Sequence, residues 1–508
     1  MSSLVLTPVL VPLCTALITA ALVAQPRAQR LAAFLGTGAL LGCALALLRE
    51  VQRAGLVRTQ LGAWPAPFGI ELVADGLGAA MVLIMAIVGV VTLLFQQSCA
   101  DPAPPAPGLL PLFSVLLAGV GGTFVTGDLF NLYVWFEVML LAALGLLALG
   151  GGASHLDGTL KYFVLNTLGT LLLLIGIGYL YAATGHLNFG ALREAAGRSD
   201  AASWLPLLVV PLLAFLVKAG AFPLFAWLPA SYHTLPGPLL ALFAGLLTKV
   251  GVYAILRMLS DVFATSPRVL YECIGWLAVP TMIVGALGAA YHWDLRRILA
   301  FHVISQIGYL LLGVGLGTMA GASATVFYLG HNVLAKTNLI LIAAIVSRLG
   351  GSYDLRRCGG LYKARPLLAV IFLISAFAMV GAPPLSGFWA KVMLIRETLL
   401  LERGVWAAAA LATGFLTLYS MSKIWLEAFW KEAPSRSGGG VAAPAGASGP
   451  AEDPPGGLGW AYAAVGILAG LTVALGLFPE PVVSFLDRSA SQLGVARVHP
   501  TPGFGGWP

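Results

Sequence analysis

The chain has 508 residues, of which 59% are hydrophobic and only 10% are charged, with a formal net charge of +7. No soluble domain of this length presents such a composition to water, and the charges are too dispersed to form a nucleic-acid-binding surface. The composition therefore predicts an all-α polytopic protein of the cell membrane, crossing the lipid bilayer many times.

Apolar stretches of about 20 residues, the length that crosses a bilayer as a helix, recur along the whole chain and predict about fourteen spans. No positively charged residue precedes the first stretch, so we expect a membrane helix there and not a cleaved signal peptide. In chain order the predicted spans are approximately 3–24, 30–49, 76–97, 109–126, 128–149, 160–183, 204–228, 238–259, 270–291, 297–317, 323–347, 366–399, 405–430 and 459–479.

Spans 7 and 12 share a motif, since residues 220–224 read GAFPL and residues 381–385 read GAPPL. Proline removes a backbone donor and clashes with the preceding turn, so we expect both helices to be broken. Broken helices at corresponding places in two halves are typical of transporters, in which unwound backbone lines a protein-enclosed cavity. A plain proline kink in each span is the alternative.

The motifs lie five spans apart, which predicts two repeats of five helices, spans 4–8 (109–259) and spans 9–13 (270–430). An odd number of helices forces the second repeat to run inverted relative to the first. Three helices in residues 1–108 precede the repeats. A Gly-, Pro-, Ala- and Ser-rich segment at 431–458 is predicted to be a flexible linker to a last helix and tail at 459–508.

Charged residues inside the apolar spans are the strongest functional signal of the sequence. An uncompensated lysine at the centre of a membrane helix costs roughly 2.5–3.5 kcal/mol, so charges there mark function by default. The alternative is that the long side chain carries its ammonium group to the membrane surface. That alternative suits Lys423, and to a lesser degree Lys391, because both are nearer the ends of their spans than Lys218, Lys249 and Lys336. One acid, Glu137, lies in a similar apolar setting.

Motifs for cofactors and metal ions are missing from the sequence. It contains no Walker loop, no GxGxxG after a strand and no CxxC pair, so we expect neither a cofactor nor a metal site. The energy for any transport would then come from an ion gradient or a partner. The five cysteines are scattered singly, at Cys14, Cys43, Cys99, Cys273 and Cys358.

Six stretches in this order resemble the antiporter-like subunits shared by respiratory complex I and Mrp-type cation/proton antiporters, and most closely the MrpD-like branch of that family. The resemblance runs from about residue 67 to residue 430. The stretches are GDLFNLYVWFEVML around Glu137, LVKAGAFPLFAWLPASYHT around Lys218, ALFAGLLTKVGVYAILR around Lys249, RRILAFHVISQIGY around His302, LGHNVLAKTNLIL around Lys336 and GAPPLSGFWAKVMLI around Lys391.

The resemblance implies a proton path through the residues that match the family's charged and polar positions. Glu137, Lys218, Lys249, Lys336 and Lys391 would carry it, with His302 and His331 as possible relays. Each lone histidine is equally well explained as a core residue bonded to a backbone carbonyl. Many relatives have a second histidine where this chain has Asn332, and an amide cannot take up a proton at neutral pH.

A lysine in a low-dielectric interior exchanges its proton more readily than one in water, so such residues are suited to carrying protons. If Glu137 approaches Lys218 the charged lysine is favoured, and separating the two favours release. Other polar residues of these spans could line such a path or hydrogen-bond between helices, and we favour the second role. They are Tyr133, Thr248, Ser305, Gln306 and Asn338.

Three functions remain open at this stage. The first is a subunit of a multi-subunit antiporter, in which proton inflow drives Na⁺ or K⁺ out with the help of partner subunits. The second is a proton-translocating module of a redox complex such as complex I or a membrane-bound hydrogenase. The third is an accessory subunit, or a proton module coupled to inorganic-carbon capture. Basic residues at 356–365 favour placing the loops after odd-numbered spans in the cytoplasm and both termini outside.

Overall fold

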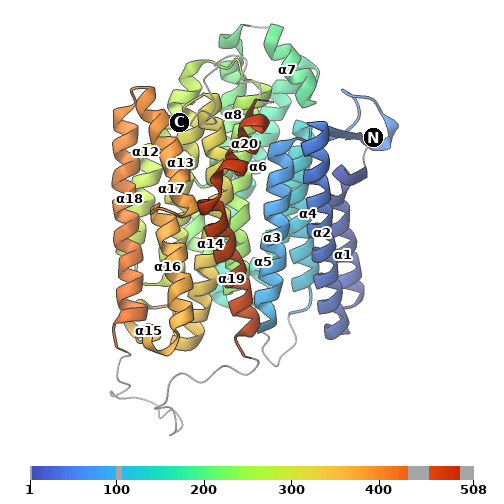
Figure 1. Ribbon diagram of the computed structural model, residues 1–508. Coiled ribbons are helices and arrows are strands. Elements are labelled where there is room, and N and C mark those ends of the chain that lie inside the picture. Colours follow the sequence, from blue (N-terminus) through green and yellow to red (C-terminus); the bar gives the residue numbers. More distant parts are fainter. Residues whose placement is uncertain (1–2, 99–105, 199, 433–456, 492–508) are drawn as a thin grey trace.

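The computed structural model describes residues 3–98, 106–198, 200–432 and 457–491. These residues form a bundle of long helices whose axes are roughly aligned with one another (Figure 1). Twelve of the described helices are long and apolar enough to cross a membrane, and α4 (Leu109–Val125) and α16 (Pro366–Val380) are shorter apolar helices. This arrangement agrees with the fourteen predicted spans. Most of the predicted linker at 431–458 and the end of the tail lie outside the described residues.

The helices follow the predicted order. The N-terminal group contains the 3-10 turn η1 (Ser3–Leu6), α1 (Thr7–Ala21), α2 (Pro26–Ala54) and α3 (Gly76–Ser98). The next five spans are α4, α5 (Leu129–Ala148), α6 (Ala153–Thr184), the pair α8 (Leu205–Ala219) and α9 (Trp227–Tyr232), and a helix made of α10 (Gly237–Leu242), the π-helical turn η4 (Phe243–Leu247), α11 (Thr248–Arg257) and the π-helical turn η5 (Met258–Val262). The following five are α12 (Arg268–Tyr291), α13 (Leu295–Gly315), α14 (Met319–Gly350), the pair α16 and α17 (Ser386–Leu400), and α18 (Gly404–Ile424) with the π-helical turn η7 (Trp425–Trp430), before the last span, α19 (Gly459–Leu477).

Short elements cover the two ends of the bundle, and the sequence pattern did not predict them. An antiparallel hairpin pairs β1 (Val57–Gln60) with β2 (Glu71–Ala74), and its strands are too short to show a clear period. We call the end that carries α7 (Phe189–Arg198) the α7 face, and the end that carries α15 (Leu361–Ala364) the α15 face (Figure 1). The remaining short elements are η2 (Leu61–Ala63), η3 (Ala201–Trp204), η6 (Leu355–Arg357) and the amphipathic α20 (Pro479–Ala490).

Both predicted helix breaks are present and share one backbone geometry. Gly220 ends α8 at φ 75° and ψ 41°, and Gly381 ends α16 at φ 94° and ψ 37°. Glycine tolerates this left-handed conformation because it has no Cβ. The amide after each glycine donates to a carbonyl five residues earlier, at 3.1 Å in the first break and 2.9 Å in the second. Non-helical backbone follows in each case, so the prediction is confirmed and the plain kink is excluded.

Antiparallel bridges at opposite ends of the bundle support the inverted repeat. Asp128 caps α5 and its backbone bridges that of Asn188, next to α7. Asp294 caps α13 in the corresponding way and bridges Asp354, a few residues before α15. The same feature, an aspartate N-cap with an antiparallel bridge, therefore lies at the α7 face in the first repeat and at the α15 face in the second.

The core of the bundle lies around two spans, one from each repeat. The most apolar window of the helix from Gly237 to Val262 is completely buried inside the protein, and that of α13 is 94% buried, whereas that of α2 is only 28% buried. A fully enclosed helix cannot place charged side chains in lipid or in headgroups. Charges on these central spans must therefore find partners inside the protein.

Candidate functional site

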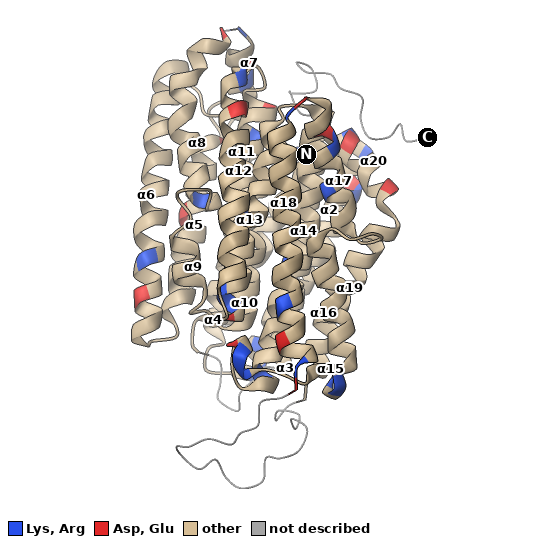
Figure 2. Ribbon diagram, turned by 90° about the vertical axis from the view of Figure 1, so that its left-hand side faces the viewer, with Lys and Arg blue, Asp and Glu red and all other residues tan. Residues whose placement is uncertain are grey.

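Lysine and arginine, aspartate and glutamate gather at the two ends of the bundle, and few of them interrupt its middle (Figure 2). The five charged residues of the predicted site lie on α5, α8, α11, α14 and α17, and the two histidines lie on α13 and α14. The site therefore draws on both repeats.

Lys218 lies in the last turn of α8, beside the first helix break. Its side chain is buried, its ammonium group lies 5.5 Å from the ring centroid of Phe136, and no described protein atom accepts a hydrogen bond from it. Glu137, the next residue on α5, is only partly buried and lies within electrostatic reach of Lys218 without a direct ion pair. The two predicted partners are therefore neighbours separated by a gap.

Lys249 lies one residue into α11, directly after the π-helical turn η4. Its side chain is fully buried and donates to the carbonyl of Ala244 at 2.6 Å. π-Helical turns inside α-helices are frequent at functional sites. Their backbone groups depart from the regular α-helical hydrogen-bonding pattern. Gly251 lets α11 approach α8, since a Cβ at that position would lie 2.6 Å from the backbone nitrogen of Ala219. The spans that carry Lys218 and Lys249 thus pack backbone against backbone.

Lys336 lies near the middle of α14 and is fully buried, and none of the described residues accepts a hydrogen bond from its ammonium group. It is within electrostatic reach of Lys249 on the neighbouring span. A Cβ added at Gly245 of η4 would lie 2.6 Å from the hydroxyl oxygen of Thr337, which shows how closely the two spans pack. The pair links the first repeat to the second.

Lys391 follows the second break, in the second turn of α17. Its ammonium group donates to the carbonyls of Met379 at 3.1 Å and Val380 at 2.7 Å, and lies 4.9 Å from the ring centroid of Tyr309. The side chain therefore reaches back across the break to the last two carbonyls of α16.

Both predicted histidines are buried and bonded to serines rather than to backbone carbonyls. The Nε2 atom of His302 lies 2.6 Å from the hydroxyl oxygen of Ser420, and the Nδ1 atom of His331 lies 2.8 Å from that of Ser386. The second ring nitrogen of each has no hydrogen-bond partner among residues 3–98, 106–198, 200–432 and 457–491. Both rings are within electrostatic reach of the ammonium groups of Lys336 and Lys391.

Several polar atoms around these residues are buried without a protein partner, which is unusual in a folded interior. Some expected contacts between helices exist, such as Asn338 donating to Ser375 at 2.8 Å and Tyr328 donating to Gln306. The hydroxyl groups of Thr248 and Ser305 and both amide atoms of Asn332 have no such partner. Polar surroundings of this kind suit water-mediated hydrogen bonds.

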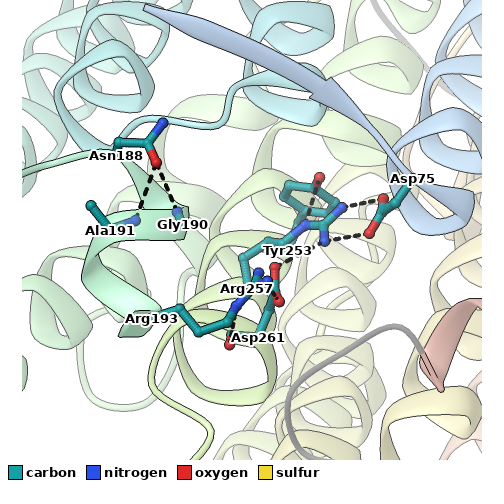
Figure 3. Close-up of polar contacts among 8 residues, drawn as sticks. All are labelled: Asp75, Asn188, Gly190, Ala191, Arg193, Tyr253, Arg257 and Asp261. Atoms are coloured by element: carbon teal, nitrogen blue, oxygen red, sulfur yellow. Dashed lines mark hydrogen bonds and ion pairs between the residues drawn. The ribbon is translucent and has the colours of Figure 1, made fainter. Parts of the chain in front are cut away.

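The sequence did not predict a cluster of ion pairs that lies at the α7 face (Figure 3). Arg257, at the end of α11, donates through both terminal nitrogens to Asp75, the residue before α3, and also contacts Asp261 of η5 at 3.4 Å. Arg193 of α7 pairs with Asp261, and Tyr253 accepts from Arg257 at 3.0 Å while donating to the carbonyl of Phe124 at 2.8 Å. Burial opposes the ionisation of Asp75, but Arg257 holds the pKa of that carboxyl below its usual range.

The sequence did hold a signal for this cluster. Arg257 and Asp261 are four residues apart at the end of an apolar span, a spacing that places them on one face of a helix. Its partner Asp75 is 182 residues away in sequence and could not be identified without the fold. Metal binding has no comparable support, since no group of three or more His, Cys, Asp or Glu side chains in the described residues could hold an ion.

The chain matches known proteins in sequence and in structure. The family model described as "NADH:quinone oxidoreductase/Mrp antiporter, TM" matches residues 126–417. A protein named as the D subunit of a Na(+)/H(+) antiporter, from Alkalihalophilus pseudofirmus, is 41% identical over 433 residues, which are 85% of this chain and 88% of the relative. A protein of the same name from Bacillus subtilis is 35% identical over 435 residues, again 85% and 88% of the two chains.

Solved structures agree with this result. A chain of the Mrp complex from Dietzia sp. DQ12-45-1b has a TM-score of 0.88 and 30% identity, with 97% of this chain and 98% of that chain covered. A chain of respiratory complex I from Thermus thermophilus has a TM-score of 0.80 and 26% identity, with 98% and 100% covered. The resemblance expected from the sequence is thereby confirmed, and the protein belongs to the NADH:quinone oxidoreductase/Mrp antiporter family of membrane proteins.

Proposed function

We propose that this chain is a proton-conducting subunit of a multi-subunit monovalent cation/proton antiporter in the cell membrane, in which proton inflow drives the export of Na⁺ or K⁺. One observation carries the proposal, namely the row of buried basic side chains that runs from Lys218 through both repeats to Lys391. Such charges are costly in a membrane protein and have little use other than in moving charge. The names of the two Na(+)/H(+) antiporter relatives support the same function.

The proposed path begins at Glu137 and Lys218 and continues through Lys249, Lys336 and Lys391. Each ammonium group is shielded from bulk water, which eases the release of its proton. His302 and His331 serve as relays between the last two lysines, since a neutral imidazole has one donor and one acceptor nitrogen. Asn332 can orient water but cannot carry a proton.

Glu137 and Lys218 are proposed to act as the switch of the path. Their gap leaves room for two states, one with the carboxylate close to the ammonium group and one with the two separated. Approach favours the charged lysine and separation favours proton transfer to Lys249. Glu137 is partly exposed on the surface of this chain, so a partner subunit that contacts α5 is placed to control the distance.

The proposed division of the chain follows from this path. Residues 1–108 and 459–508 flank the conducting part at 109–430, whose halves are 109–259 and 270–430, and residues 431–458 link it to the last helix. The chain by itself would then be a transporter subunit and not an enzyme, with no cofactor of its own. The α15 face, which carries the basic residues at 356–365, is proposed to face the cytoplasm.

The proposal is tested in everted membrane vesicles that contain the chain together with its partner subunits. Addition of Na⁺ or K⁺ should release protons from acidified vesicles, and a pH-sensitive dye reports the change. Vesicles with Lys218→Ala assembled to the same level serve as the matched control. Cation-induced pH changes of equal size in both preparations would contradict the proposal.

A redox-driven proton module is the second candidate, because this fold also occurs in respiratory complex I. Under that alternative an electron-transfer partner would supply the energy. Proton movement should then follow addition of an electron donor and should not respond to Na⁺ or K⁺. Isolation of the intact complex and identification of its subunits separate the two cases.

A further inference from the structure

Polar contacts leave the proposed path at His302 and lead toward the α15 face. The hydroxyl group of Ser420, which contacts the His302 ring, lies on α18 one turn before Lys423. The Lys423 ammonium group donates to the carbonyls of Ala290 and His292, both at 2.6 Å. Residues three apart on a helix have their Cβ atoms about 5–6 Å apart, so one water molecule can bridge Ser420 and Lys423.

A cavity of about 360 Å³ opens beside the point where this row of contacts ends. Its wall includes His292, which follows α12, Arg297 in the first turn of α13, His233 after α9, and Asp157 and Lys161 of α6. Lys161 and Asp157 form an ion pair at 2.5 Å, whereas no described side chain pairs with the Arg297 guanidinium. The cavity therefore combines charged and titratable groups at the membrane surface.

The surroundings of the two histidines of the cavity favour their neutral form. Burial and the nearby Arg297 guanidinium hold the pKa of His292 below its usual range. The pKa of His233 is lowered in the same way, against the opposing effect of its contact with the Pro229 carbonyl at 2.9 Å. A neutral imidazole can accept a proton on one nitrogen and release one from the other.

The inverted repeat offers an internal comparison for Lys423. Lys423 lies two residues before the π-helical turn η7 on the last span of the second repeat, and Arg257 lies directly before η5 on the last span of the first. Arg257 is locked into ion pairs with Asp75 and Asp261 and, as an arginine, keeps its proton. At the α15 face the cation is instead a lysine that contacts neutral carbonyls and the Trp293 ring, forms no ion pair with a described carboxylate, and lies next to the cavity.

From these contacts we propose that Lys423, with His292 and the cavity beside it, is the point at which protons pass between the α15 face and His302, with Ser420 as the connecting group. The inference rests on the proposed function and extends it, because it adds a connection to one membrane surface. The corresponding end of the first repeat is closed by the Arg257 ion pairs.

A purely structural role for Lys423 is the competing explanation. A lysine that donates to carbonyls at the end of a helix stabilises that end, and the Trp293 ring, 5.2 Å from the ammonium group, adds a cation–π contact. Arginine would serve this role equally well, because its guanidinium also donates to carbonyls. Only a role in proton transfer requires a group that can release its proton.

The test compares Lys423→Arg with Lys423→Ala in the complete complex, in everted vesicles with equal amounts of assembled protein. We expect both variants to lower the initial rate of cation-induced pH change to about a tenth of wild type or less, as for loss of a positioned proton-transfer group. Arginine that restores wild-type exchange would overturn the proposed role. Wild-type vesicles without any cation-induced pH change would overturn the proposed function itself.

A second test compares Ser420→Ala with Ser422→Ala, because neither substitution removes a charge. Ser420 is fully buried against His302, whereas Ser422 is exposed on the same helix. We expect Ser420→Ala to slow exchange several-fold and Ser422→Ala to leave it unchanged. Equal rates in these two variants would overturn the route even if the Lys423 variants failed to assemble.

Discussion

Lys391 donates a hydrogen bond of 2.7 Å to the carbonyl of Val380, across the break between α16 and α17. The lysine at the other break, Lys218, has no hydrogen-bond acceptor in the part of the protein that the structure describes. The two repeats therefore share one backbone geometry at their breaks, but the lysines beside the breaks differ in their hydrogen bonding. In the proposed path Lys391 is held in place by the end of a helix, whereas Lys218 is free to respond to Glu137.

Gly381→Ala tests whether the second break positions Lys391. The residue has φ 94°, and a Cβ would lie 2.7 Å from the Cδ atom of Lys391. We expect a loss of about 1–2 kcal/mol in stability from the left-handed conformation and slower exchange from displacement of the lysine. Gly404→Ala is the control, because nothing lies within 4 Å of its added Cβ. Equal exchange rates in both variants would show that the position of Lys391 tolerates this disturbance.

Lys218→Ala, Lys218→Arg and Glu137→Gln should each abolish cation/proton exchange while the complex still assembles. Alanine and glutamine remove one member of the proposed switch, and arginine keeps a charge that it cannot release. Initial rates of dye recovery in everted vesicles measure the effect. Lys363→Arg, an exposed lysine of α15, is the control and should behave as wild type. Substantial exchange by Lys218→Arg would argue against proton transfer through this residue.

Lys249→Ala should slow exchange more than Lys336→Ala. Lys249 is the only basic residue predicted to connect Lys218 with the second repeat, whereas the unpartnered Nε2 atom of His331 and nearby water offer a partial substitute for Lys336. We expect a loss on the order of 10²-fold for Lys249→Ala and a smaller loss for Lys336→Ala. Negligible losses in both variants would leave the lysine row without a role in transport.

The sequence predicted the features of the site that depend on local physics. Apolar length marked the spans, the two GAFPL-like motifs marked the breaks, and the cost of a charge in lipid marked Lys218, Lys249, Lys336 and Lys391. All four are buried in the protein, as a functional assignment requires. Their roles in proton transfer remain predictions.

Features that depend on contacts between distant segments could not be predicted. The serine partners of His302 and His331 lie 118 and 55 residues away, and nothing in the local pattern distinguishes them from other serines. Thr248 and Ser305 were expected to bond between helices, but their hydroxyl groups have no hydrogen-bond partner among the described residues. The hairpin of β1 and β2 and the Asp75–Arg257 pair likewise require the folded chain.

Arg257→Ala should destabilise the protein strongly, because it leaves Asp75 and Asp261 buried without their shared cation. Removing one member of a buried ion pair costs about 3–5 kcal/mol, whereas removing an exposed one costs less than about 1 kcal/mol. Arg198→Ala is the matched control, since its pair with Glu194 is exposed. Thermal unfolding of the detergent-solubilised complex should separate the two variants clearly.

A double variant identifies the cause of the loss. Asp75→Asn together with Arg257→Gln removes both charges of the pair, so no buried carboxylate is left opposite a missing guanidinium at Asp75. We expect this double variant to be more stable than Arg257→Ala, because much of the cost of breaking such a pair is the charge left behind. If the double variant is as unstable as Arg257→Ala, the loss comes from packing around α11 and not from the unpaired carboxylate. Exchange by the double variant, if it assembles, should be retained, because the Arg257 cluster lies outside the proposed path from Lys218 to Lys391.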